Sequence, residues 1–207
     1  MQKVGNVLVI DHYVQTPQQL VEDVRSMREA TGADIVLGEY GAPIPDIHGD
    51  LSSSEQAKLI EDNLKAIAGE RSYVRGINYW TALGGSTRIF DDIKEPRDAV
   101  SVLTTYYTPL KVTGKVTDTI GTPINHATIN IAPYGAINTD ALGRFQALTT
   151  PDELQATIEK DGYKRQKADL EIGEDGQINV RVALEPQKRG VLYRLKLWFS
   201  NVLGLLT

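Results

Sequence analysis

The sequence predicts an α/β protein that contains a partial (β/α)8 barrel, made of the last three βα units, followed by a small all-β sandwich and a C-terminal amphipathic helix. Apolar runs alternate with helical patterns as far as residue 107, which indicates strand–helix repeats. Short alternating runs separated by turn residues begin at residue 111, which is typical of a sandwich. The last segment has apolar residues at helical spacing. We place the domains at residues 1–109, 110–187 and 188–207.

The composition excludes some classes of protein. The chain has 207 residues, of which 41% are hydrophobic and 24% charged, as expected for one or two globular domains. Its net charge of -5 argues against a nucleic-acid-binding protein, because such surfaces need clustered lysine and arginine. The chain has no cysteine, so it has no disulfide framework and no thiolate metal site.

Three strands are expected in the first part, at residues 4–10, 35–37 and 74–80. The continuous apolar run at 35–37 is typical of a parallel strand that is buried on both faces. Consecutive strand–helix units give parallel neighbours whose carboxyl ends meet at one edge. Since a closed barrel needs eight such strands, we expect residues 1–109 to be its last three units, with the first five outside this chain.

Helix signals separate these strands. Thr16 is the predicted N-cap of a first helix that Gly32 ends, and Ser52 opens a capping box for a second helix that Gly69 ends. A third helix is expected to open at Pro96. Its predicted buried stripe consists of Ala99, Val100, Leu103 and Tyr107.

The last segment, residues 188–207, combines an apolar face with Lys188, Arg189, Arg194 and Lys196 and contains no acidic residue. It is too short and too charged to span a bilayer, which takes ~20 apolar residues. An amphipathic helix on an anionic membrane surface and a helix packed against its own domain or a partner fit the pattern equally well.

Glu39 is the principal candidate residue, because it ends the second apolar run between Gly38 and Gly41. A carboxylate at the carboxyl end of a barrel strand lies where barrel enzymes keep their chemistry. An ordinary solvated glutamate at a strand exit is the alternative for this residue taken alone.

Three strand ends together resemble a known family. Residues 38–41, Gly-Glu-Tyr-Gly, are similar to the end of the seventh strand in retaining glycoside hydrolases of the cellulase and β-glycosidase clan. Residues 76–80, Gly-Ile-Asn-Tyr-Trp, resemble the eighth strand, and His12 with Tyr13 resembles the sixth. The resemblance covers residues 4–107.

The resemblance implies a role for each of these residues. Glu39 would be the catalytic nucleophile, Trp80 the floor of the sugar subsite, and His12 and Tyr13 contacts to the substrate or the nucleophile. Tyr13 is expected to donate a hydrogen bond to Glu39, and aromatic packing is the alternative role for Tyr13 and Trp80. The family's acid/base glutamate follows an asparagine, and this sequence has no Asn-Glu pair. We therefore expect the chain alone to be inactive.

Residues 112–184 resemble a second family, the carboxypeptidase regulatory-like domain of the transthyretin-like sandwich type. The matching motifs are Val-Thr-Gly-Lys-Val-Thr-Asp at 112–118, Gly-Thr-Pro-Ile at 121–124 and Gly-Arg-Phe at 143–145. This pattern specifies a fold and says little about function. The family's domains serve as spacers or accessory modules beside surface enzymes.

Two further sets of residues are weaker candidates. Asp46, His48 and Asp50 are compatible with a metal or sugar site, although a solvated loop is the simpler interpretation. We expect His126 to be structural, and we expect neither a metal nor a cofactor.

The sequence thus indicates the C-terminal part of a retaining β-glycosidase, acting on a β-linked glycan, at the cell surface or outside the cell. Its partners would be a carbohydrate substrate and the N-terminal part of the barrel, with residues 188–207 contacting a membrane surface. No signal peptide follows Met1, so an export signal would lie upstream. The alternative is a non-catalytic surface or carbohydrate-binding protein with a degenerate barrel remnant.

Overall fold

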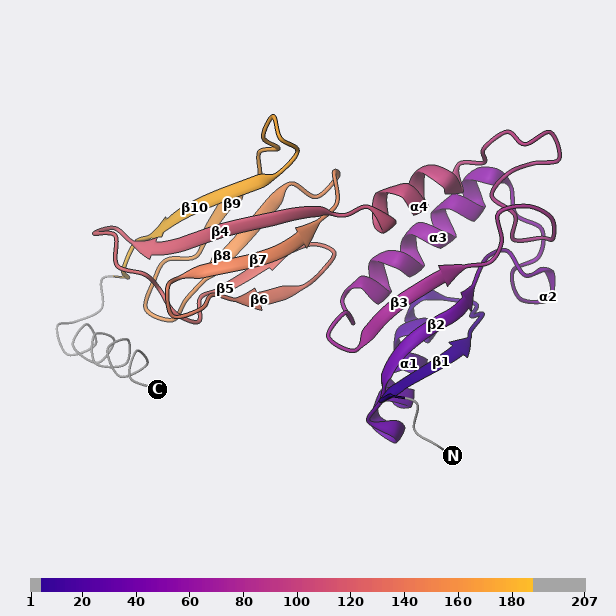
Figure 1. Ribbon diagram of the computed structural model, residues 1–207, viewed down its shortest axis with the longest axis horizontal. Coiled ribbons are helices and arrows are strands. Elements are labelled where there is room, and N and C mark those ends of the chain that lie inside the picture. The colour runs from indigo at the N-terminus through magenta and orange to yellow at the C-terminus, as the bar shows by residue number, and fades with distance from the viewer. Residues whose placement is uncertain (1–4, 188–207) are drawn as a thin grey trace. The chain divides into compact units, whose positions relative to one another are not determined.

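The computed structural model describes residues 5–187 (Figure 1). It divides into two compact units between Thr108 and Pro109, and each unit is described here by itself. The predicted basic helix at 188–207 lies outside the described residues. Among the described helices, none combines the length and apolar character needed to cross a membrane.

Unit 1, residues 1–108, contains a parallel three-stranded sheet in the order β1-β2-β3. The strands are β1 Val7–Asp11, β2 Asp34–Tyr40 and β3 Val74–Tyr79. Spatial order follows chain order, as strand–helix repeats predict. The described residues show no closed barrel. Of the partial-barrel prediction, only the mixed α/β character of unit 1 is therefore shown.

The helices of unit 1 are α1 Pro17–Thr31, α2 Pro45–His48, α3 Ser53–Ala68 and α4 Ala99–Tyr107. Two predicted starts are confirmed: Thr16 Oγ1 accepts the Gln19 N–H, and Ser52 forms a reciprocal capping box with Glu55. The third helix is present, but Pro96 forms an isolated β-bridge instead of opening it. Of its predicted buried stripe, Ala99 and Leu103 are buried, whereas Tyr107 is 46% exposed.

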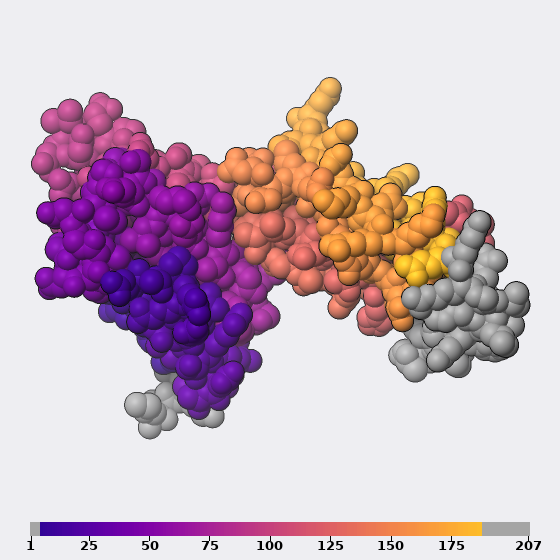
Figure 2. Space-filling view, turned by 180° about the vertical axis from the view of Figure 1, so that it is seen from behind, coloured from indigo at the N-terminus to yellow at the C-terminus, as the bar shows by residue number. Residues whose placement is uncertain are grey.

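One face of the sheet in unit 1 is covered and the other is open. Leu8 and Ile10 of β1 pack against a core to which α1, α3 and α4 contribute. The alternate residues Val7 and Val9 are 45% and 62% exposed. Because successive side chains of a strand point to opposite faces, the face that carries Val9 has no cover within this unit. The burial on both faces predicted for residues 35–37 is therefore met on one face only, where Ile35 and Leu37 are buried, while Val36 on the other face is half-buried. Figure 2 shows the indigo residues at the surface of unit 1.

Unit 2 is a β-sandwich. One sheet has the order β10-β4-β7, formed by β10 Ile178–Leu184, β4 Leu110–Asp118 and β7 Arg144–Thr149. The other has the order β6-β5-β8-β9, formed by β6 Ala136–Asn138, β5 Thr128–Ile131, β8 Gln155–Glu159 and β9 Gln166–Asp169. The sandwich prediction is confirmed. The sequence pattern does not indicate β6, which has only three residues, or β9, whose residues are mostly polar.

The core of unit 2 lies between its two sheets. Strand β10 shows the pattern directly, since Ile178, Val180, Val182 and Leu184 are buried and the residues between them are exposed. At Gly114 the two neighbouring strands of the same sheet, β7 and β10, leave no room for a side chain. A Cβ there would lie 2.4 Å from the Phe145 ring and 2.8 Å from a backbone oxygen. The glycine therefore allows β4 to lie directly against the phenylalanine.

Candidate functional site

Glu39 is the penultimate residue of β2, at the carboxyl edge of the parallel sheet. It pairs in register with Asp11, the last residue of β1, just after an irregularity in the ladder. Asp11 lies two residues beyond Val9, so both belong to the open face, and Glu39 shares that face with its register partner. The sequence did not single out Asp11, although the pairing brings a second carboxylate to the same edge.

Tyr13 lies directly beside this carboxylate. Its hydroxyl donates a hydrogen bond to Glu39 Oε2 at 3.0 Å, the contact expected from the sequence. Burial, followed by the hydrogen bond to Glu39 and the negative charges of Glu39 and Asp11, raises the pKa of Tyr13 to about 12. Tyr13 therefore keeps its proton at neutral pH and acts only as a donor toward the carboxylate.

Trp80 follows the end of β3 and lies next to the end of β2. Its backbone N–H donates to the Tyr40 carbonyl at 2.8 Å, and its side chain is 51% exposed. Gly41 makes this close approach possible, because a Cβ at that position would lie 2.1 Å from the Trp80 carbonyl oxygen. Gly41, the last residue of the Gly-Glu-Tyr-Gly motif, thus allows the backbone at Trp80 to lie close to the end of β2.

His12 makes different contacts. Its backbone N–H donates to the Glu39 carbonyl at 2.9 Å, while its ring Nε2 lies 3.0 Å from Asp23 Oδ2 on α1. The ring therefore ties the end of β1 to the first helix. A contact of this ring with a substrate remains a prediction.

A buried glutamine holds the loops at this edge, and the sequence reasoning missed it. Gln56 of α3 is fully buried, and its Nε2 lies 2.8 Å from the Ala42 carbonyl and 3.1 Å from the Arg88 carbonyl. Arg97 Nε donates to Gln56 Oε1 at 2.6 Å. One side chain thus joins the loop after β2 to the loop after β3. A glutamine in a helical pattern carries no signal that would reveal this role.

Both ring nitrogens of His48 form hydrogen bonds with backbone groups. Its Nδ1 accepts the Ile44 N–H at 2.9 Å, so Nε2 carries the proton that it donates to the Val14 carbonyl at 2.8 Å. No group of three potential metal ligands occurs among the described residues, and so Asp46 and Asp50 do not form such a cluster with His48. The histidine instead fastens the short helix α2 to the loop after β1.

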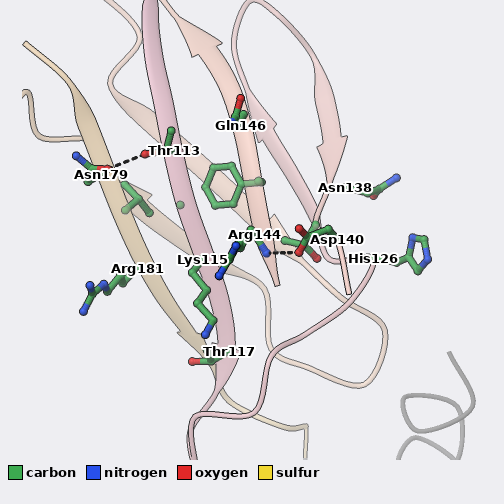
Figure 3. A pocket seen from close by; sticks show the side chains of 14 residues that line it. Thr113, Lys115, Thr117, His126, Asn138, Asp140, Arg144, Gln146, Asn179 and Arg181 are labelled. Carbon is green, nitrogen blue, oxygen red and sulfur yellow. Dashed lines mark hydrogen bonds between the residues drawn. The ribbon is translucent and has the colours of Figure 1, made fainter. Parts of the chain in front are cut away.

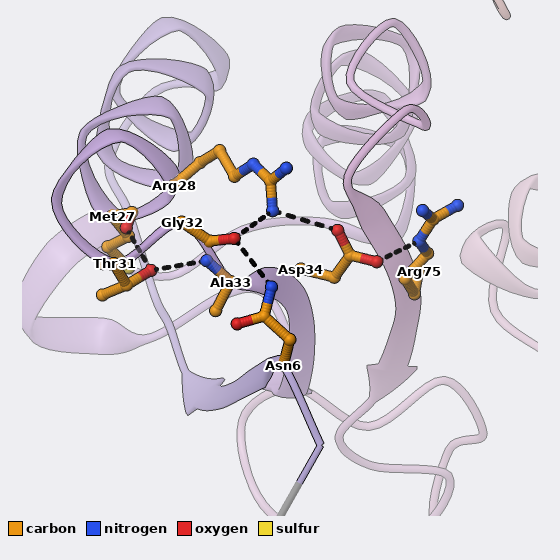
Figure 4. A network of polar contacts seen from close by, with 8 residues as sticks. All are labelled: Asn6, Met27, Arg28, Thr31, Gly32, Ala33, Asp34 and Arg75. Carbon is orange, nitrogen blue, oxygen red and sulfur yellow. Dashed lines mark hydrogen bonds and ion pairs between the residues drawn. The ribbon is translucent and has the colours of Figure 1, made fainter. Parts of the chain in front are cut away.

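The opposite edge of the sheet is held by charge pairs (Figure 4). Asp34, the first residue of β2, lies between Arg28 at 3.1 Å and Arg75 at 2.7 Å. Arg28 also donates to the Gly32 carbonyl at 2.7 Å, where a left-handed residue ends α1. These contacts stabilise the amino ends of β2 and β3.

Unit 2 has a shallow polar depression on its three-stranded sheet (Figure 3). His126 lies at its margin, in a turn with a positive φ of 50°. Its backbone N–H donates to the Thr139 carbonyl at 3.1 Å, which agrees with the structural role expected for this residue.

Comparison with known families identifies unit 2. Residues 111–185 match the carboxypeptidase regulatory-like domain. The carboxypeptidase regulatory-like domain predicted from the sequence is confirmed. No curated protein matches the chain.

Solved structures that are similar to the chain include two β-glucuronidases and a dioxygenase. The FMN-binding β-glucuronidase from Facaelibacterium prausnitzii L2-6 is 14% identical, over 90% of this chain and 34% of that one, with a TM-score of 0.42. The β-glucuronidase from an uncultured Clostridium sp. is 21% identical, over 49% and 23%, with a TM-score of 0.40. The 3-chlorocatechol 1,2-dioxygenase from Rhodococcus opacus 1CP is 14% identical, over 38% and 60%, with a TM-score of 0.30. The chain spans less than two thirds of each, and similarities at this level carry no functional inference.

Proposed function

We propose that unit 1 carries the nucleophile half of the active site of a retaining β-glycosidase, with Glu39 as the nucleophile. The observation that carries this proposal is the 3.0 Å hydrogen bond from the Tyr13 hydroxyl to Glu39 Oε2 at the carboxyl edge of the sheet. A tyrosine that keeps its proton orients the carboxylate and leaves its charge available for attack.

The chemistry assigns one step to this chain. A Glu39 oxygen attacks the anomeric carbon of the glycoside, and the bond from that carbon to the leaving oxygen breaks with its electron pair on the oxygen. The half-exposed Trp80 offers an apolar face to the C–H surface of the sugar. In retaining hydrolysis a second carboxylate, ~5 to 5.5 Å from the nucleophile, protonates the leaving oxygen and later activates water.

We place that second carboxylate on strands that complete the sheet. Two features of the chain support this placement: it has no Asn-Glu pair, and Val7 and Val9 are exposed on the open face that carries Glu39. Parallel sheets are covered on both faces, so this face calls for further βα units. They are either the earlier part of the same barrel or a partner chain that supplies them.

A covalent label tests the proposal. Dinitrophenyl 2-deoxy-2-fluoro-β-glycosides have a leaving group that departs without protonation, so the first step needs Glu39 alone. We expect one sugar of a glucosyl, galactosyl, mannosyl and glucuronyl panel to add its mass to the peptide that contains Glu39. The Glu39→Gln variant should gain no mass, whereas the exposed Glu22→Gln control should be labelled as the parent is. Labelling of the Glu39→Gln variant, or of neither protein by any sugar, would contradict the assignment.

Steady-state turnover gives an independent check. With half of the catalytic pair outside the chain, an ordinary aryl glycoside should not be hydrolysed. Turnover that disappears in Glu39→Gln would show that the acid/base also lies within these 207 residues.

The second candidate function is a non-catalytic surface or carbohydrate-binding protein, which the missing Asn-Glu pair favours. It predicts that a neutral β-glycan binds through Trp80 while no fluoroglycoside labels Glu39. Loss of binding in Trp80→Ala, with no adduct in the parent protein, would favour this function over catalysis.

We also propose an extracellular or cell-surface location, in keeping with a β-linked glycan as substrate. From the sequence pattern of residues 188–207 we further propose that this segment contacts an anionic membrane. Liposome flotation of the chain with and without these residues tests it, and equal flotation of both forms would end the idea.

A further inference from the structure

Three positive side chains form one line across the outer face of the three-stranded sheet in unit 2. Arg181 of β10 is the register partner of Lys115 of β4, and Lys115 is in turn the partner of Arg144 of β7. All three are exposed. Neighbouring strands lie ~4.8 Å apart, so the line places a cation at each strand spacing. Figure 3 shows the three side chains on their three strands, and we name this line the cation row.

A second line of neutral polar side chains lies beside the cation row, two residues along each strand. It consists of Asn179, Thr113 and Gln146, which are again register partners across β10, β4 and β7. Thr113 Oγ1 donates to Asn179 Oδ1 at 2.6 Å, which leaves the Asn179 amide N–H groups to other partners. This neutral row both donates and accepts hydrogen bonds, as groups that bind sugar hydroxyls must.

No member of the cation row forms an ion pair among residues 5–187. One acidic residue, Asp140, lines the depression, and its Oδ1 already accepts the backbone N–H groups of Leu142 and Arg144. Like charges directly opposite each other destabilise a sheet. Three cations in register are therefore costly to the fold unless a ligand offsets them.

We propose that the cation row and the neutral row together bind an acidic polysaccharide, one whose repeating sugars carry carboxylate or sulfate groups. Charge complementarity supplies the first reason, because a chain of net charge -5 presents here a local line of three cations. The adjacent neutral row supplies the second, since the hydroxyl groups of a polysaccharide need amide and hydroxyl partners next to the charges. Each row has the regular spacing that a repeating ligand requires.

Other polyanions fit this face less well. The exposed members of both rows are polar, whereas the centre of a protein interface is enriched in aromatic residues and methionine and depleted in lysine. Segments that recognise anionic lipids carry clusters of ~4–8 basic residues, more than this row holds. The acidic chain as a whole argues against nucleic acid.

Binding of defined polysaccharides to the 207-residue chain tests this proposal. The probes are polygalacturonate as the carboxylated polymer, heparin as the sulfated one and dextran as the neutral one. We expect at least one acidic polymer to bind, with affinity that falls as salt is added, and dextran not to bind. The variant K115Q/R144Q/R181Q should lose about tenfold in affinity or more, because three exposed charge contacts are removed together. Thr113→Val should weaken binding while leaving every charge in place.

A matched control variant distinguishes binding at the cation row from a general effect of removing three positive charges. The variant K164Q/R165Q/K167Q removes three positive charges from the other side of unit 2, at and before β9, and should bind as the parent does. Circular dichroism shows whether both triple variants are folded. The proposal is overturned if neither acidic polymer binds, if both triple variants lose affinity equally, or if polyglutamate or phosphatidylglycerol vesicles bind as tightly at equal charge.

Discussion

The two units of this chain differ in how completely their sheets are covered. Unit 2 closes its core between two sheets, and the inward residues of β10 are almost fully buried. Unit 1 has three parallel strands with helices against one face, and Val9 on the other face is 62% exposed. The sequence pattern of unit 2 therefore corresponds to a complete fold, whereas that of unit 1 corresponds to a sheet with only one covered face.

The comparison also separates two kinds of site. In unit 1 the proposed nucleophile, Glu39, lies on the open face, and the second carboxylate of the proposed mechanism would come from further strands. In unit 2 the proposed binding face lies on a finished sheet, and strand register alone assembles the cation row. The proposed site at Glu39 therefore needs further strands, whereas the cation row lies on a sheet that the chain itself completes.

Separating the units should give the largest effect. We expect residues 109–187 alone to unfold in one cooperative transition, because their core is closed. Residues 1–108 alone should bind the dye ANS, because their apolar face is open. A sharp unfolding transition of residues 1–108 without dye binding would break the comparison.

Two glycine substitutions should sharpen it. Gly114→Ala places a Cβ 2.4 Å from the Phe145 ring and should destabilise unit 2 by ~1–3 kcal/mol, as overpacked cores do. In unit 1 a Cβ at Gly76 would meet Val36 at 3.9 Å, an ordinary contact. Urea unfolding followed by circular dichroism measures the first variant. Limited proteolysis should show no faster cleavage in Gly76→Ala, and faster cleavage would mean that the open face is packed.

The Tyr13 titration should give the smallest effect. The pKa of Tyr13 rises from 10.0 to about 12 in the folded protein. The protonated hydroxyl therefore contributes its full stability to the folded state below pH 10, and this contribution is lost as the pH rises through about 12. Burial is the first cause and Glu39 the second, so Glu39→Gln should lower the pKa without restoring 10.0. Ultraviolet titration, with Tyr13→Phe identifying the signal, measures the shift. An unchanged pKa in Glu39→Gln would show that the pair is not coupled.

Much of the local structure could be predicted from the sequence, because its signals lie within a few residues. Thr16 and Ser52 cap helices as expected, since a cap binds an N–H only three residues away. The signal failed at Pro96, where pairing with Phe90 replaced the expected helix start. The helix-start signal yielded there to a pairing within the loop that precedes α4.

The candidate site divides in the same way. The sequence indicated Glu39 by its position after an apolar run and Tyr13 and Trp80 through the family resemblance, and the hydrogen bond between Tyr13 and Glu39 is present. It gave no sign of Gln56, whose partners lie 14 to 41 residues away in two loops. Nor did it indicate that the ring of His12 would meet Asp23 on α1.

By itself the sequence determined the alternation of strands and helices in unit 1, the sandwich of unit 2 and the strand end that carries Glu39. Only the tertiary structure decided which face of the β1-β2-β3 sheet is exposed and which three cations are register partners on neighbouring strands of unit 2. The physical reason is the register between strands: Arg181 and Lys115 are separated by most of unit 2 and meet because β10 pairs with β4. Pairing over such distances in sequence depends on how whole sheets pack, which no local pattern records.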